Sequence, residues 1–217
     1  MVVMFFKKLA EFSEFLIPLQ GLSQAEIPTG CEAVSTTAVL QYYDIDISID
    51  IFIEKYLPCD TFYWKNEKLH GPNPHEFFVG NPYTRNSLGC YPDVIMKALN
   101  KMKHKDYPGI SDLIFEKTTD VEIEDLIQSY IINGIPVIVW VTIDMNEPYN
   151  GMQYYLEDET LYTWKAQEHC TVLCGYDKAH YYLMDPLKDG EIVAYPKELV
   201  EERYKQMGKN SIVIDRC

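Results

Sequence analysis

Apolar residues recur at helical spacing early in the chain. In CEAVSTTAVLQYYD, which begins at Cys31 after the small pair Thr29-Gly30, Ala33, Thr37 and Leu40 recur at helical spacing, with Val34, Ala38 and Gln41 beside them. This spacing predicts a helix with Cys31 in its first turn. A second helix is predicted from Pro92 to about Lys103, because proline is well tolerated at the start of a helix.

A third helix is predicted over residues 121–133, where one face is apolar. Thr119 and Glu122 have the spacing of a capping box, and Gly134 with Pro136 is expected to end the helix. A fourth helical pattern covers residues 197–207.

Continuous or alternating apolar runs predict strands in the second half. The run IPVIVWVTI (135–143) is typical of a central strand buried on both faces. Residues 170–176 and 181–186 flank a polar turn and predict an antiparallel hairpin, and 211–214 form a last strand. Helices followed by an antiparallel sheet indicate an α+β fold. We expect a cleft where these two parts meet.

Residues 45–91 are rich in Pro, Gly, Asn and aromatic side chains, which predicts an ordered but irregular excursion, with an insertion at about 57–91. Loops of this length are often functional. Its aromatic side chains are expected either to wall the cleft and set specificity or to cap the core. They are Tyr63, Trp64, Phe77, Phe78 and Tyr83.

Composition narrows the class of protein. The chain has 217 residues, 47% of them hydrophobic and 24% charged, as expected for one globular domain spanning residues 1–217. The formal net charge of −14 would repel phosphate backbones and anionic membrane surfaces. We therefore expect no nucleic-acid partner and no membrane association, while the oligomeric state stays open.

The number of cysteines and the sequence of the N-terminus indicate in which cellular compartment the protein is expected. The six cysteines are too sparse for a disulfide scaffold in a chain of this size. Residues 1–19 lack the uninterrupted apolar run of an export signal. Both observations favour a cytoplasmic protein with reduced thiols.

Cys31 is the candidate nucleophile. A thiolate is stabilised by a helix N-terminus and a nearby histidine, which lower the pKa of a thiol. The alternative is a small apolar residue buried at the start of a core helix. His169, just before a predicted strand, is the best candidate for the general base. The other four histidines lie where solvated histidines are common: His70, His75, His104 and His180.

Asp185 and Gln24 are candidate supports for this pair. Asp185 ends the second strand of the predicted hairpin, near His169, where it could accept from the imidazole; a one-residue change in register would turn it away. Gln24 could form an oxyanion hole with the backbone N–H of Cys31, although Gln20 competes for this role.

Metal and nucleotide cofactors are not indicated. His169, Cys170 and Cys174 cluster in sequence, but on one strand His169 would point away from the two cysteines, which argues against zinc. Glycine-rich nucleotide motifs are also missing from the sequence.

Five features follow one another along the chain: Gln24, IPTGCEAVS (27–35), GIPVIVWV (134–141), HCTVLCGYD (169–177) and LMDPL (183–187). In this order they resemble the bacteriocin-leader-peptidase-like branch of the papain-like cysteine peptidase superfamily (clan CA). The resemblance covers most of the chain from about residue 16, and the stretch at 71–83 resembles an insertion of stand-alone members.

This resemblance implies a papain-like fold in which a helical part carrying the nucleophile packs on an antiparallel sheet. It also implies that Cys31 is the nucleophile, His169 the base, Asp185 its orienting partner and Gln24 the oxyanion donor. The expected activity is hydrolysis of a peptide or small protein. An amidase, isopeptidase or acyltransferase with the same residues stays open, as does a silent binding module.

Overall fold

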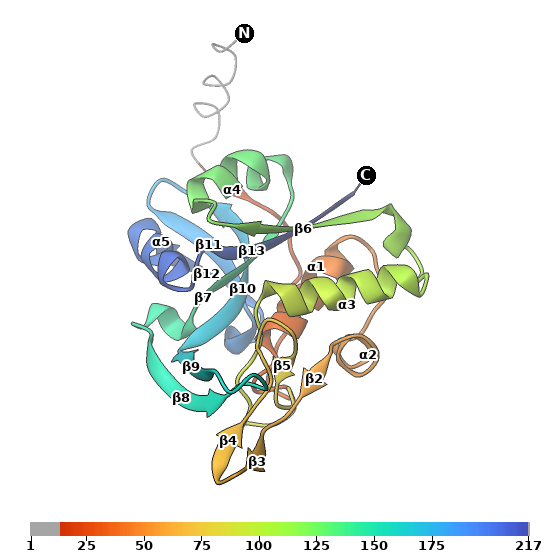
Figure 1. The fold of residues 1–217 in the computed structure, drawn as a ribbon. Helices are drawn as coiled ribbons and strands as arrows, with labels where there is room; N and C mark the ends of the chain where they lie inside the picture. The colour runs from red at the N-terminus through yellow and green to blue at the C-terminus, as the bar shows by residue number, and fades with distance from the viewer. Residues whose placement is uncertain (1–13, 217) are drawn as a thin grey trace.

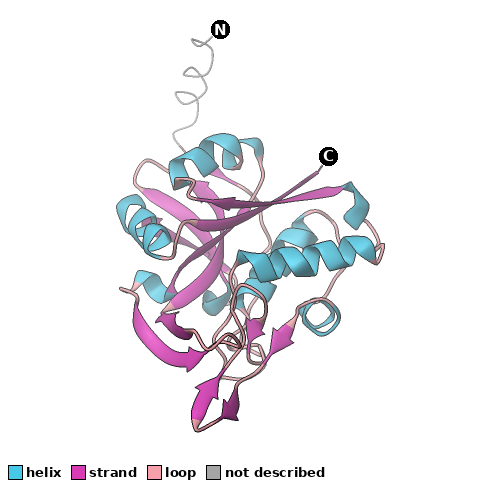
Figure 2. Cartoon of the chain, in the orientation of Figure 1, coloured by secondary structure: helices cyan, strands magenta, loops and turns pink. Residues whose placement is uncertain are grey.

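The computed structural model describes residues 14–216 and contains helices and three sheets (Figure 1, Figure 2). The helices are α1 (Cys31–Tyr42), α2 (Ile49–Lys55), α3 (Pro92–His104), α4 (Ile123–Ser129) and α5 (Lys197–Gln206), with single 3₁₀ turns η1 (Ile110–Asp112), η2 (Ile131–Asn133), η3 (Ile143–Met145) and η4 (Pro186–Lys188). The strands are β1 (Phe15–Leu16), β2 (Cys59–Asp60), β3 (Tyr63–Lys65), β4 (Lys68–His70), β5 (Phe78–Val79), β6 (Leu113–Thr119), β7 (Val137–Thr142), β8 (Tyr149–Tyr155), β9 (Leu161–Ala166), β10 (Glu168–Tyr176), β11 (His180–Asp185), β12 (Glu191–Pro196) and β13 (Asn210–Arg216).

The main sheet is antiparallel, with strand order β12-β11-β10-β7-β13-β6, and β1 pairs with β10. Every residue of β7 is buried, as the continuous apolar run at 135–143 predicts for a central strand. The predicted hairpin is present, because β10 and β11 pair with Val172 opposite Met184.

Helices cover both sides of this sheet, with α1 and α3 on one side and α5 on the other (Figure 1). Helix α1 contacts β10 and β7, and α5 contacts β7, β11 and β12. The first residues of α1 are thereby placed over β10. This arrangement confirms the predicted α+β fold, a helical part packed on an antiparallel sheet.

Segment 45–91 contains more regular structure than its composition suggested. Helix α2 begins after Ser48, whose side chain accepts from the N–H of Ile51, and β3 and β4 form a hairpin. That hairpin joins β8 and β9 in a four-stranded sheet through a parallel pairing of His70 with Tyr155. Segment 45–91 is therefore joined by strand pairing to β8, which comes much later in the chain.

The helix predicted at 121–133 is shorter than expected, and the predicted capping box does not form. Helix α4 begins at Ile123, and the N-cap Glu122 makes no side-chain capping bond. Its carboxylate accepts from the ammonium of Lys209 instead. The predicted C-terminal part is the 3₁₀ turn η2, which ends at Gly134 in the left-handed region.

No helix within residues 14–216 combines the length and the apolar character needed to cross a membrane. Most of the N-terminal segment considered for an export signal lies outside the described residues.

Candidate active site

A cleft of about 330 Å³ lies between the start of α1 and the main sheet. Three of the four predicted site residues line it: Gln24, Cys31 and His169. Its other walls come from the β8–β9 hairpin and from Leu187 in η4. Of the insertion at 57–91, only Ser87 and Leu88 line this cleft, whereas the aromatic residues Tyr63 and Phe77 line a separate hollow.

Cys31 is the first residue of α1, as predicted, and its side chain is 6% exposed. Its thiol donates a hydrogen bond to Glu32 Oε2 over 3.4 Å. Burial raises the pKa of the Cys31 thiol well above its ordinary value, and the carboxyl groups of Glu32 and Glu168 raise it further. The lowered pKa that was expected from the helix N-terminus is therefore wrong for this arrangement.

His169 and Asp185 are brought together by the β10–β11 pairing. In the register that places Val172 opposite Met184, Asp185 lies on the same face as His169 and diagonal to it. His169 Nε2 lies 2.7 Å from Asp185 Oδ1, and both side chains are buried. The bond to Nε2 leaves Nδ1 as the ring nitrogen available to the cleft.

Asp185 is held in place by several contacts. Its Oδ1 also accepts from the N–H of Leu187 over 2.9 Å, which caps η4. Burial raises the pKa of this carboxyl, but the hydrogen bond and charge of His169, the Leu187 N–H and the charge of Lys188 lower it more, so that the net pKa lies below the usual value.

Gln24 lies in the cleft, whereas its competitor Gln20 is exposed and does not line it. The Gln24 amide donates to the carbonyl of Pro28 over 3.3 Å, and the backbone N–H of Gln24 donates to Pro186 over 3.1 Å. Because a side-chain amide carries two N–H donors, one stays available for a ligand.

Glu32 and Glu168 are two acidic neighbours of the cleft that the sequence analysis missed. Glu32 is completely buried and accepts from the backbone N–H of Cys90, whose carbonyl in turn accepts from the indole of Trp140. Glu168 is 7% exposed and lines the cleft beside His169. The only signal in the sequence was that each glutamate is adjacent to a candidate catalytic residue.

The remaining histidines differ in exposure to solvent more than expected. His75 and His104 are exposed and His180 is half-buried, but His70 is 1% exposed and stacks on Tyr63. The expectation that His70 is solvated is wrong, because the β3–β4 hairpin packs against β8 and covers it.

Comparisons with known proteins show which fold and which family this chain shares. The chain is similar over 94% of its length, at 25% identity and a TM-score of 0.78, to a putative C39-like peptidase from Bacillus anthracis, of which 98% is covered. It also has the fold of a double glycine motif protease from an AMS/PCAT transporter, solved with its leader peptide: 15% identity, TM-score 0.51, with 94% of this chain and 95% of that one covered.

No curated protein matches the chain. The model of the Peptidase_C39 like family, however, matches residues 17–212, nearly the whole of the described structure. The chain therefore belongs to the Peptidase_C39 like family and is a cysteine-type peptidase of papain-like fold.

Proposed function

We propose that the protein hydrolyses peptide bonds with Cys31 as nucleophile, His169 as general base, Asp185 as its orienting partner and Gln24 as oxyanion donor. The observation that carries the proposal is the cleft that Cys31 and His169 share, with His169 Nε2 held 2.7 Å from a buried carboxylate. The bond to Nε2 leaves Nδ1 to exchange a proton with the thiol.

In the first half-reaction, His169 Nδ1 takes the thiol proton as Cys31 Sγ attacks the carbonyl carbon, and the carbonyl π electrons move to oxygen. The Gln24 amide and the Cys31 N–H stabilise this oxyanion. Collapse of the intermediate expels the amine, which takes the proton from Nδ1, and leaves a thioester. In the second half, Nδ1 takes a proton from water as its oxygen attacks the thioester, and the thiol is regenerated as the acid leaves.

The cleft favours peptides with apolar side chains. Tyr149 and Met152 on β8 and Leu187 in η4 line it and are 59%, 44% and 41% exposed. Such exposed apolar groups around a cleft are typical of a binding surface. The solved protease that holds its leader peptide supports a peptide substrate, and the net charge of −14 favours cationic sequences.

A peptide library tests the activity directly. Incubation with the protein, with and without added primary amines, is followed by mass spectrometry. We expect new carboxyl termini in both reactions, and none with Cys31→Ala. New amides in place of carboxylates would identify an acyltransferase, and intact peptides under all conditions would identify a silent binding module.

Gln24→Ala is expected to lower kcat by about 100-fold, because one oxyanion donor is lost at the point where charge develops. KM should change little, since the carbonyl of the bound substrate carries much less charge than the oxyanion. Steady-state kinetics on one cleaved peptide measures both constants.

Gln20→Ala is the matched control, since Gln20 is exposed outside the cleft and should leave both constants unchanged. Equal losses in the two variants would remove Gln24 from the mechanism.

A further inference from the structure

We propose that Cys31, Glu32 and Glu168 form a binding site for a Zn²⁺ ion, which blocks the thiol when it is bound. Within residues 14–216, this is the one group of three or more Cys, His, Asp or Glu side chains whose donor atoms lie close enough to share an ion, all within 4.8 Å of one another. It shares no residue with the sequence cluster of His169, Cys170 and Cys174.

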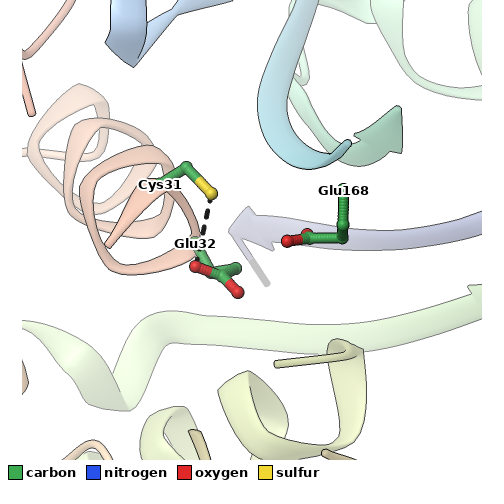
Figure 3. A group of neighbouring side chains, drawn as sticks. All are labelled: Cys31, Glu32 and Glu168. Carbon is green, nitrogen blue, oxygen red and sulfur yellow. Dashed lines mark hydrogen bonds between the residues drawn. The ribbon is translucent and has the colours of Figure 1, made fainter. Parts of the chain in front are cut away.

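The donors converge from two elements. Cys31 and Glu32 come from the first turn of α1, and Glu168 comes from the start of β10, with its carboxylate pointing toward that of Glu32 (Figure 3). The 3.4 Å between Cys31 Sγ and Glu32 Oε2 is close to the separation of about 3.5 Å that two such ligands have around a tetrahedral zinc ion.

The backbone leaves room for both carboxylates. Gly89, at φ +141°, lies against them, and a Cβ atom at this position would lie 2.6 Å from Glu32 Oε1 and 3.0 Å from Glu168 Oε2. A side chain at Gly89 would therefore fill the space in which the two carboxylates meet.

One carboxylate oxygen of the site, Glu168 Oε1, has no partner. This oxygen is buried and makes no hydrogen bond, and Glu168 as a whole is only 7% exposed. No ion pair joins Glu32 or Glu168 to a basic side chain anywhere in residues 14–216. Buried carboxylates are ordinarily paired with cations or bind metals.

Zinc binding is coupled to the loss of protons from its ligands. Binding forms a Zn–S bond and Zn–O bonds, and the thiol proton, with any proton that the two carboxyl groups hold, passes to solvent.

The donor set selects zinc over harder ions. Ca²⁺ and Mg²⁺ take oxygen ligands only and require more of them, whereas one thiolate with two carboxylates suits Zn²⁺ with water in the open position. An ion can enter from the cleft, because Cys31 and Glu168 line it, and Glu32 forms the buried end of the site.

Cobalt spectroscopy tests the binding on the whole chain. The protein, reduced and freed of metal with a chelator, is titrated with Co²⁺, which gives a thiolate-to-metal charge-transfer band when sulfur is a ligand. We expect one ion per chain with this band, displaced by Zn²⁺. Cys31→Ser should abolish the band, and Glu168→Gln should weaken binding by at least about tenfold.

Cys59→Ser is the matched control, since Cys59 is the exposed cysteine of the described chain and should leave the titration unchanged. Circular dichroism of each variant shows that it is folded. Loss of the band in Cys59→Ser, or unaltered affinity in Glu168→Gln, would overturn the site.

The inhibitory effect rests on the proposed function and has a separate readout. Zn²⁺ should stop peptide cleavage and a chelator should restore it, and the half-inhibitory concentration for Glu168→Gln, relative to its own metal-free rate, should rise at least about tenfold. A wild type that cleaves peptides but gives no thiolate band would refute the metal site alone. A band without any peptide cleavage would refute the proposed function alone.

Discussion

Cys31→Ala is expected to reduce kcat/KM for peptide hydrolysis by at least about 10,000-fold, because removal of the nucleophile of a coupled catalytic set eliminates the covalent route altogether. The fold should be retained, since the side chain is small and lies at the first position of α1, at the edge of the cleft. Initial rates on one cleaved peptide, with unfolding in urea as the check on stability, measure the two effects separately.

Two further variants sharpen this result. Cys31→Ser keeps the volume and the backbone donor, but a hydroxyl is a much weaker nucleophile, so it should be almost as inactive as alanine. Cys59→Ala, at the exposed cysteine, should keep full activity. A Cys31→Ala protein with more than a few per cent of wild-type activity would show that another group attacks the substrate.

The central part of the fold was predictable because its residues are buried on both faces. A run such as that at 135–143 has few structural alternatives, and it became β7 with every residue buried. The hairpin of β10 and β11 was predictable for a related reason, since two apolar runs flank a polar turn.

The missed strands are those whose stability comes from pairing rather than from their own pattern. Strands β6 and β12 form the two edges of the main sheet, and most of their residues are exposed or half-buried. Their sequences show no clean alternation, so only the partner strand determines their conformation. The same holds for β8 and β9, which form the wall of the cleft.

In the candidate site, too, features with a local sequence pattern were predictable and features set by tertiary contacts were not. The placement of Cys31 and His169 in one cleft was expected from their local elements together with the family resemblance, but the electrostatics of the thiol could not be anticipated. The direction of its pKa shift depends on burial and on two glutamates, one of them brought from β10 by the packing of α1 on the sheet. Tertiary contacts of this kind leave no periodic signal in the sequence.

Asp185→Ala is expected to lower kcat/KM by about 1,000-fold, because without an acceptor at Nε2 the imidazole of His169 loses its fixed tautomer and orientation. It should also reduce the free energy of unfolding by about 1–3 kcal/mol, since the buried Nε2–H and the N–H of Leu187 both lose their acceptor. Both of these bonds are made to a single atom, Asp185 Oδ1.

Asp185→Asn is therefore the informative comparison. Its amide oxygen can occupy the place of Oδ1 and accept from both donors. We therefore expect only about a tenfold loss of kcat/KM, because papain-like proteases also function with a Cys-His-Asn set. Equal kcat/KM for the alanine and asparagine variants would show that the negative charge, rather than the acceptor, is what His169 requires.

The effect of Asp185→Asn on the free energy of unfolding is expected to depend on pH. Because the pKa of Asp185 is lowered in the folded protein, its ionised form contributes stability above the pKa of an unfolded aspartate, about 3.9, and that contribution is lost as the pH falls through the folded pKa. The difference in unfolding free energy between wild type and Asp185→Asn should thus be largest above about pH 5 and shrink toward acid. Urea unfolding at several pH values measures it, and a difference that does not change with pH would show that the carboxyl group is not ionised in the folded protein.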